Sequence, residues 1–194
     1  HNVLKACVRA GVKHVVLTSS TAAVTPQRPD SARHTGLHFD ESHWNVDSTM
    51  TEGSYRYSKV IAEQAAWTFA RAQGAVVHET FPLDGDAQLL PFSHAIDGVS
   101  DTIKAQYQRH PFALTVVNPS FVIGPPVLAR DEGVSVGFVA KMLRGGFKEL
   151  DGGSCFGAVD VRDVAAAHVA AMDTPSAAGR RFVLSSPELS PTLG

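Results

Sequence analysis

Two short β-branched apolar runs, each followed at once by polar residues, constrain the fold of this chain more than any other feature. They are residues 14–18 (His-Val-Val-Leu-Thr) and residues 114–118 (Leu-Thr-Val-Val-Asn). Runs of this length and composition suit strands that are buried on both faces. The strongest helical pattern of the chain, residues 54–73, lies between them. Strands that alternate with helices in this way predict an α/β fold with a parallel sheet.

Further segments continue the alternation. Apolar spacing predicts helices over residues 3–8, 134–144 and 164–172, and strands over 158–161 and 181–185. Gly11 and Gly74 follow two of the helical patterns, where glycine commonly ends a helix. Residues 25–53 are rich in Pro, Asp, Ser, Thr and His and predict a long loop.

Composition narrows the class of protein. The 194 residues carry a formal net charge of −2, so no basic surplus favours nucleic acid as a partner. Two cysteines without metal-ligand spacing rule out a disulfide framework and indicate a reducing compartment. No apolar run reaches the ~18 residues that a membrane-spanning helix needs. We therefore expect a cytoplasmic protein with no nucleic-acid partner and no membrane partner.

Tyr55 and Lys59 form the most informative pair of polar residues. They are four residues apart on the strongest predicted helix and therefore share a face. A lysine ammonium beside a tyrosine favours the phenolate, which suits a group that exchanges a proton with a carbonyl or an alcohol. Tyr57 lacks this partner because its own fourth neighbour is Ile61. A pair of this kind on a solvated helix surface is also common, so the pair alone does not establish a catalytic site.

Ser19 and Ser20 follow the first predicted strand directly. The carboxyl ends of parallel strands line the ligand crevice of open α/β sheets, so a hydroxyl here could hold a substrate oxygen. The alternative is that Ser19, Ser20 and Thr21 satisfy backbone groups where the strand ends.

Several motifs in a fixed order resemble those of the extended short-chain dehydrogenase/reductases, within the NAD-dependent epimerase/dehydratase superfamily. The resemblance is greatest to the branch that includes dihydroflavonol-4-reductase, cinnamoyl-CoA reductase and aldehyde reductase. It covers most of residues 1–74 and 112–186. The motifs that carry it are residues 2–7 (NVLKAC), 15–20 (VVLTSS), 40–44 (DESHW), 55–67 (YRYSKVIAEQAAW), 118–126 (NPSFVIGPP), 159–165 (VDVRDVA) and 179–182 (GRRF).

The resemblance implies roles for particular residues. Tyr55 would donate a proton to the carbonyl oxygen, Lys59 would hold the nicotinamide ribose, and Ser20 would orient the carbonyl. It also implies a cofactor, NADP or NAD, and a small-molecule carbonyl or alcohol substrate for a monomer or a homodimer. The cofactor-binding residues implied by position are Tyr55, Lys59, Pro119, Val122 and Ser135.

Two departures from the family pattern shape the expected domain. The family's glycine-rich dinucleotide fingerprint is absent, since neither Gly145-Gly146 nor Gly152-Gly153 has the required spacing between a strand and a helix. Residues 75–111 form an unusually long connection and are expected to be an insertion, the alternative being intron sequence translated in error. We therefore expect residues 1–194 to be a partial NAD(P)-binding Rossmann-like reductase domain. It is the C-terminal portion of a doubly wound parallel sheet, lacking the N-terminal βαβ units and the C-terminal segment.

Three functions follow as hypotheses. The first is NAD(P)H-dependent reduction of an aldehyde or ketone to an alcohol, or the reverse, by Ser20, Tyr55 and Lys59. The second is a sugar-nucleotide epimerase or dehydratase, which shares the Tyr/Lys pair. The third is an inactive fragment without the cofactor phosphate loop.

Two side features favour structural interpretations. His34, His38 and His43 lie close to Asp40 in the sequence, but a loop does not fix them on one face, so we expect no metal site. Trp44 lies where relatives line the substrate side, although an aromatic residue that covers the core is equally consistent.

Overall fold

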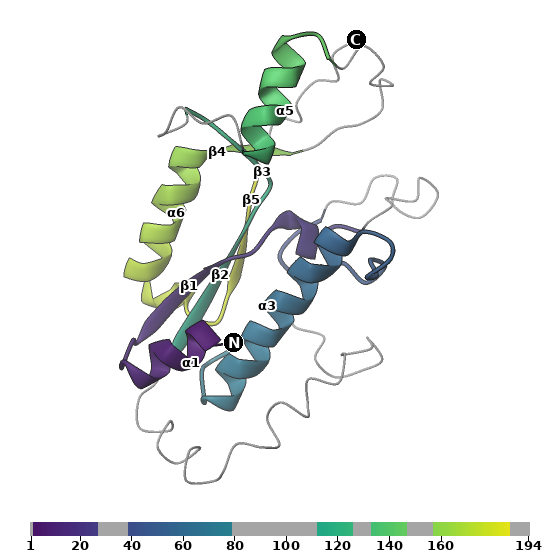
Figure 1. Cartoon of the computed structure of the whole chain (residues 1–194). Helices are drawn as coiled ribbons and strands as arrows, with labels where there is room; N and C mark the ends of the chain where they lie inside the picture. The colour runs from purple at the N-terminus through teal and green to yellow at the C-terminus, as the bar shows by residue number, and fades with distance from the viewer. Residues whose placement is uncertain (1, 27–38, 79–111, 126–132, 147–156, 187–194) are drawn as a thin grey trace.

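The computed structural model describes residues 2–26, 39–78, 112–125, 133–146 and 157–186. Six helical elements are present in this part of the chain: α1 (Asn2–Arg9), η1 (Thr21–Ala23), α3 (Ser54–Ala72), α5 (Val134–Leu143), α6 (Val161–Asp173) and η3 (Pro175–Ala177). The strands of the same part are β1 (His14–Thr18), β2 (Ala113–Pro119), β3 (Phe121–Ile123), β4 (Ala158–Asp160) and β5 (Arg181–Leu184) (Figure 1).

The described strands form two parallel sheets. The larger sheet has the order β1-β2-β5, with Val16 opposite Thr115 and Val117 opposite Phe182. The smaller sheet pairs β3 with β4. The prediction of an α/β fold with parallel strands is therefore confirmed.

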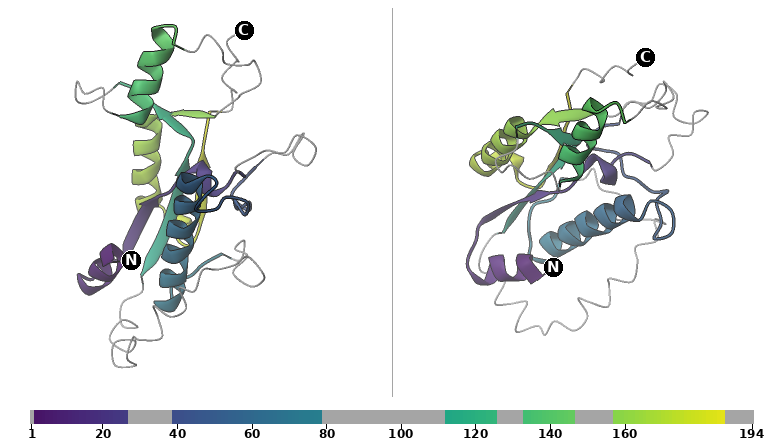
Figure 2. Two further views of the ribbon diagram at one scale, coloured as in Figure 1. Left: turned by 45° about the vertical axis from the view of Figure 1, so that its right-hand side comes forward. Right: turned by 45° about the horizontal axis from the view of Figure 1, so that its top comes forward.

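Helices cover both faces of the larger sheet. α1 and α3 lie against one face, and α6 lies against the other, as the right-hand view of Figure 2 shows. α5 lies with β3 and β4 beyond the end of the larger sheet in both Figures 1 and 2. This arrangement brings the start of α3 to the carboxyl ends of β1 and β2.

The core lies between the sheet and the pair α1 and α3. Side chains alternate between the two faces of a strand, so Leu114 and Val116 of β2 face α3. Trp67 and Ala70 of α3 meet them there with no exposed surface. Burying a side chain such as Leu114 or Val116 stabilises the fold by about 1.5–3 kcal/mol. The buried members of this cluster are Leu4, Val8, Ala66, Trp67, Phe69, Ala70, Phe112, Leu114 and Val116.

Most predicted elements match the structure, with two corrections. The three-residue strand β3 was not expected, because the turn signal of Gly124-Pro125-Pro126 masks it. The helical spacing over residues 134–144 also predicts that Phe138 and Met142 are core residues. α5 instead has no fully buried side chain, and Phe138 packs edge-on against Phe121 at 5.1 Å between ring centroids.

The expected insertion at residues 75–111 falls mostly outside the described residues. Its first four residues are described and continue the packing of α3: Ala75 and Val77 contact the core, and the His78 amide donates to the Gly179 carbonyl at 3.1 Å. Within the described ranges no helix combines the length and the apolar character needed to cross a membrane.

Candidate active site

The two predicted strand ends adjoin each other in space. The Ser19 amide donates to the Val117 carbonyl at 2.7 Å, which extends the pairing of β1 and β2 by one residue. Asn118 Nδ2 donates to the Ser20 carbonyl at 3.1 Å. Ser20 and Pro119 are therefore neighbouring positions on one edge of the sheet, where the crevice of an open parallel sheet lies.

Ser20 has a structural role of its own. Its Oγ accepts a hydrogen bond from the Ala22 amide at 3.1 Å and caps η1. The side chain is half-buried, so part of it still faces solvent. Ser20 therefore satisfies a backbone amide where the strand ends, which is the alternative that the sequence analysis left open. Because its oxygen accepts in this bond, its hydroxyl proton remains available for another acceptor.

Tyr55 and Lys59 lie in the first two turns of α3. Gly53 precedes the helix with φ of 75°, a left-handed conformation that a residue with a Cβ adopts only at a cost. Tyr55 is 62% exposed, and Lys59 Nζ lies 5.7 Å from the centre of the Tyr55 ring. In the described part of the chain neither the Tyr55 nor the Lys59 side chain hydrogen bonds to Ser20.

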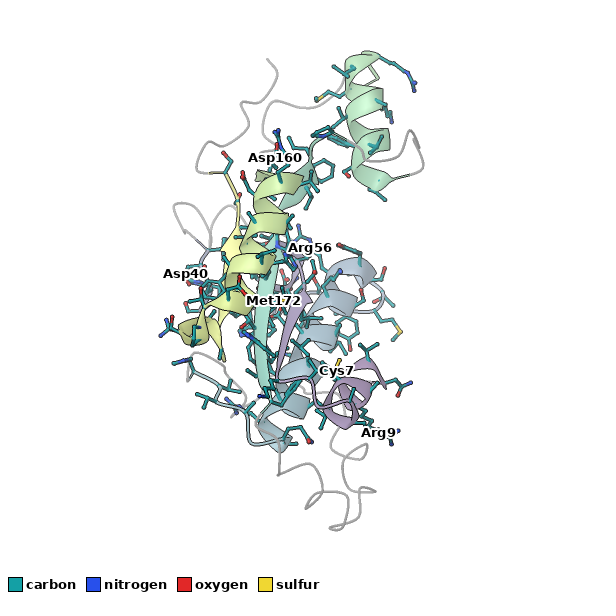
Figure 3. All side chains as sticks on the ribbon, turned by 90° about the vertical axis from the view of Figure 1, so that its left-hand side faces the viewer. Cys7, Arg9, Asp40, Arg56, Asp160 and Met172 are labelled. Carbon is teal, nitrogen blue, oxygen red and sulfur yellow. The ribbon has the colours of Figure 1, made fainter. Side chains whose placement is uncertain are left out.

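Arg56 anchors this end of α3 to the sheet edge. Its Nη1 donates to the Thr25 carbonyl at 3.1 Å and to Thr25 Oγ1 at 2.8 Å. Thr25 Oγ1 in turn donates to the Thr21 carbonyl of η1. Figure 3 shows Arg56 at the start of α3. The turn that carries Tyr55 is therefore tied to the segment that follows Ser20.

The other predicted cofactor-binding residues lie on different elements. Pro119 is buried at the end of β2, and Val122 is half-buried in β3. Ser135 lies in the first turn of α5, which packs against β3. Ser135 therefore lies beside the smaller sheet, on a different element from Ser20 and from Tyr55.

A buried polar network lies directly beneath these residues. Glu63, fully buried on α3, accepts hydrogen bonds from Ser19 Oγ at 2.6 Å and from Asn118 Nδ2 at 2.7 Å. Its other carboxylate oxygen lies 2.9 Å from Arg181 Nε, an ion pair whose geometry is not that of an aligned hydrogen bond. Burial lowers the pKa of Arg181, and the Glu63 carboxylate acts in the opposite direction.

Sequence reasoning assigned no role to Glu63, Asn118 or Arg181. For two of them the sequence does contain an indication of a buried polar role. Glu63 lies four residues after Lys59 on the apolar side of a helix, and Asn118 ends an apolar strand. A charged or amide side chain in such a position must find a buried partner. Arg181 offers no comparable signal, because Arg180 and Arg181 are adjacent and the sequence does not say which one faces inward.

Trp44 belongs to this network. The Arg181 guanidinium lies 3.9 Å from the centre of the Trp44 ring, and its Nη1 donates to the His43 carbonyl at 2.8 Å. Trp44 also packs against the core cluster. Its observed packing is that of an aromatic residue that covers the core.

Asp40 organises the start of this segment. Its carboxylate accepts from the Ser42 hydroxyl and amide and contacts His43 Nδ1 at 2.8 Å. These hydrogen bonds lower the pKa of Asp40 to about 2, the Ser42 hydroxyl contributing most. Among the described residues no three His, Cys, Asp or Glu side chains form a metal-binding group. His34 and His38 lie outside the described residues.

The glycine pairs of the chain do not form a dinucleotide fingerprint where the structure describes them. Gly145 and Gly146 follow the end of α5, and Gly145 has the positive φ of 71° that is typical of a helix C-terminus. A phosphate-binding turn must instead precede a helix. Gly152 and Gly153 lie outside the described residues.

Comparison with known proteins agrees with this fold. The 3-beta hydroxysteroid dehydrogenase/isomerase family matches residues 1–77. Cinnamoyl-CoA reductase 1 of Arabidopsis thaliana is 34% identical over 188 residues, which are 95% of this chain and 42% of the relative. Anthocyanidin reductase of Vitis vinifera is 48% identical over 75 residues, which are 36% of this chain and 21% of the relative.

A solved structure shows the same relationship in three dimensions. Gre2 from Candida albicans, determined in complex with NADPH, superposes with a TM-score of 0.59 at 27% identity, over 95% of this chain and 47% of Gre2. The chain thus spans less than half the length of the relatives that it matches. Over the matched residues its sequence is similar to the reductases represented by cinnamoyl-CoA reductase and anthocyanidin reductase.

Proposed function

We propose that this chain supplies the catalytic half of an NADPH-dependent reductase that converts an aldehyde or a ketone to an alcohol. One observation carries the proposal: the turns of α3 that bear Tyr55 and Lys59 are anchored beside the carboxyl ends of β1 and β2. Arg56 makes one anchor through Thr25, and Glu63 makes the other through Ser19 and Asn118.

The residues present suit the nicotinamide half of such a cofactor. Asn118 Oδ1 and Ser120 Oγ are buried at the end of β2 and, within the described part of the chain, lack a hydrogen-bond partner. Buried polar atoms of this kind are rare unless a ligand or water satisfies them. Tyr55, which is 62% exposed, and the Lys59 ammonium add a hydroxyl and a positive charge of the kind that suits a nicotinamide ribose. Gre2, whose solved structure contains NADPH, supports the same class of cofactor.

The proposed roles follow from these positions. The cofactor, when bound, supplies the hydride that forms the new bond to the carbonyl carbon. Tyr55 donates its hydroxyl proton to the carbonyl oxygen, so that a neutral alcohol leaves and the tyrosinate regains a proton from solvent. Lys59 stabilises the tyrosinate by its charge and holds the ribose. Ser20 orients the carbonyl oxygen through its hydroxyl proton, while Pro119, Val122 and Ser135 line the cofactor.

The proposal is tested by assaying the longest protein that the transcript encodes. NADPH oxidation should depend on an added carbonyl substrate, and the alcohol should form in equal amount. A panel of aliphatic aldehydes, aromatic aldehydes and phenylpropanoid thioesters covers the relevant chemistry. Conversion of a nucleotide sugar with no net consumption of NADPH would instead support the epimerase hypothesis. A protein that oxidises NADPH with none of these carbonyls contradicts the reductase assignment.

A further inference from the structure

One carboxylate joins the segments that carry the proposed catalytic residues. Glu63 Oε2 accepts from Ser19 Oγ at 2.6 Å and from Asn118 Nδ2 at 2.7 Å. Ser19 immediately precedes Ser20, and Asn118 immediately precedes Pro119. A single buried oxygen atom therefore fixes the ends of β1 and β2 relative to α3.

The second carboxylate oxygen extends the connection to the far strand. Glu63 Oε1 lies 2.9 Å from Arg181 Nε of β5, and the same guanidinium covers the Trp44 ring. The Val183 amide of β5 donates to Glu41 Oε1 at 2.9 Å. Through Arg181, Glu63 also holds the segment of Glu41 and Trp44 against the sheet.

Glu63 shares a helix face with the proposed proton donor. Tyr55, Lys59 and Glu63 follow one another at intervals of four residues on α3, so their side chains lie along one side of the helix. The helix is rigid over two turns. A fixed Glu63 therefore fixes both the rotation of α3 and its position along its axis, and with them the direction in which Tyr55 and Lys59 point.

Stability alone does not account for this arrangement. Taking two charges out of water carries a large desolvation cost, and well-packed apolar residues often serve the core as well as a buried ion pair does. Glu63 is fully buried and Arg181 is 3% exposed. A carboxylate that uses both oxygens to hold three separate strands defines their relative positions more narrowly than apolar contacts, which have no preferred direction.

We propose that Glu63 is a positioning residue that sets the distance between the Ser20 edge of the sheet and the Tyr55–Lys59 face of α3. This role rests on the proposed reductase function. It assigns to Glu63 an effect on the rate of the chemical step that acts through Ser19 and Asn118. It requires no contact between Glu63 and the substrate or the cofactor.

Two matched variants separate positioning from folding. Ser19→Ala removes the hydroxyl that donates to Glu63, and Thr115→Val removes a buried hydroxyl that donates to the Ala177 carbonyl at 2.8 Å. Thr115 lies on the same sheet but contacts none of the proposed catalytic residues. Both variants should lower the melting temperature. Only Ser19→Ala should lower kcat, by about 10-fold, with KM for the carbonyl and for NADPH within about 2-fold of wild type.

A spectroscopic measurement tests the same connection without activity. Trp67 Nε1 lies 3.4 Å from Glu63 Oε1, so the indole proton of Trp67 reports on the carboxylate. Glu63→Gln and Ser19→Ala should both shift the Trp67 indole resonance in a ¹H–¹⁵N spectrum of the folded protein. Thr115→Val should leave it in place.

The possible results are distinct. Equal loss of kcat in Ser19→Ala and Thr115→Val, or no loss in either, overturns the positioning role. A Trp67 resonance that ignores both Glu63→Gln and Ser19→Ala overturns the network itself. If the wild-type protein reduces no carbonyl while the Trp67 resonance shifts as expected, the proposed function is wrong. The effect of Glu63 on catalysis is then wrong as well, whereas the hydrogen-bond network is confirmed as a structural feature.

Discussion

The ammonium of Lys59 lies 5.7 Å from the centre of the Tyr55 ring, one helical turn away on the same face of α3. The ammonium lies over the ring, and within the described residues no hydrogen bond joins the two side chains. Both residues remain accessible, Tyr55 being 62% exposed. The pair is therefore open to a ligand that approaches the carboxyl edge of the sheet.

Loss of the Lys59 charge should impair both turnover and cofactor binding. Lys59→Met removes the ammonium that stabilises the tyrosinate and holds the ribose, so we expect kcat/KM to fall by about 10²-fold or more. Lys13→Met, at an exposed position before β1, is the matched control and should leave both quantities unchanged. Steady-state kinetics with varied NADPH distinguishes the two effects. Equal kinetics for the two variants would count against a role for Lys59.

The two roles of Ser20 can be separated by substitution. Ser20→Ala removes both the cap of η1 and the proposed carbonyl-orienting hydroxyl. We expect a loss of about 1 kcal/mol in unfolding free energy and a fall of about 10²-fold in kcat. Ser20→Thr keeps a hydroxyl that can cap and donate, so it should restore most of both. A Ser20→Ala protein with reduced stability but full turnover would leave Ser20 with the capping role alone.

The Glu63–Arg181 pair should be strongly coupled in stability. Glu63→Ala leaves the Arg181 guanidinium buried without its carboxylate, and such a loss costs about 3–5 kcal/mol. Arg181→Met in the same protein removes the stranded charge and should recover a large part of that loss. Urea unfolding of the wild type, both single variants and the double variant gives the coupling energy directly. Additive losses would show that the two side chains do not interact.

Asp160 should make the stability of α6 depend on pH. Its carboxylate caps α6 through the Arg162 amide at 2.8 Å and pairs with the Arg162 side chain, and these bonds lower its pKa from 3.8 to about 2. Figure 3 shows Asp160 at the start of this helix. A lowered pKa means that the stabilisation is present in full above 3.8 and is lost as the pH falls through about 2.

Variants of Asp160 test whether this stabilisation decreases as the pH falls. Asp160→Ala should melt at a lower temperature than wild type at pH 6, and the difference should shrink once the pH falls below 3.8. Asp160→Asn keeps an acceptor for the Arg162 amide and should lose less. Melting curves at several pH values measure both effects. A difference that grows as the pH falls would contradict the assignment.

The sequence predicted the order and type of most described elements because their signals are local. The β-branched runs of β1 and β2, and the apolar spacing of α3, each specify one element without reference to the rest. β3 escaped prediction because three residues ahead of a glycine and two prolines carry too little periodicity. The exposed face of Phe138 could not be foreseen either, since helical spacing does not reveal how much surface a neighbour covers.

Some residues of the proposed site could also be predicted from local sequence patterns, and others could not. Tyr55 and Lys59 stand out from their spacing on one helix, and Ser20 stands out from its place after a strand. Glu63 instead contacts residues that are distant in the sequence: Ser19 is 44 positions before it and Asn118 is 55 positions after it. Pairings at that range depend on the register of β1 against β2 and on the rotation of α3. No local sequence pattern predicts this register or this rotation, so the position of Glu63 beneath the site is known only from the structure.

The most direct test of the proposed function compares Tyr55→Phe with the wild type in the longest protein that the transcript encodes. The substitution removes one hydroxyl from an exposed ring and leaves the Lys59 ammonium and the sheet edge in place. We predict that carbonyl-dependent NADPH oxidation falls by about 10³-fold or more, while the Kd for NADPH, measured by fluorescence titration, stays within about 2-fold of wild type. Undiminished turnover by Tyr55→Phe would contradict the assignment of Tyr55 as the proton donor.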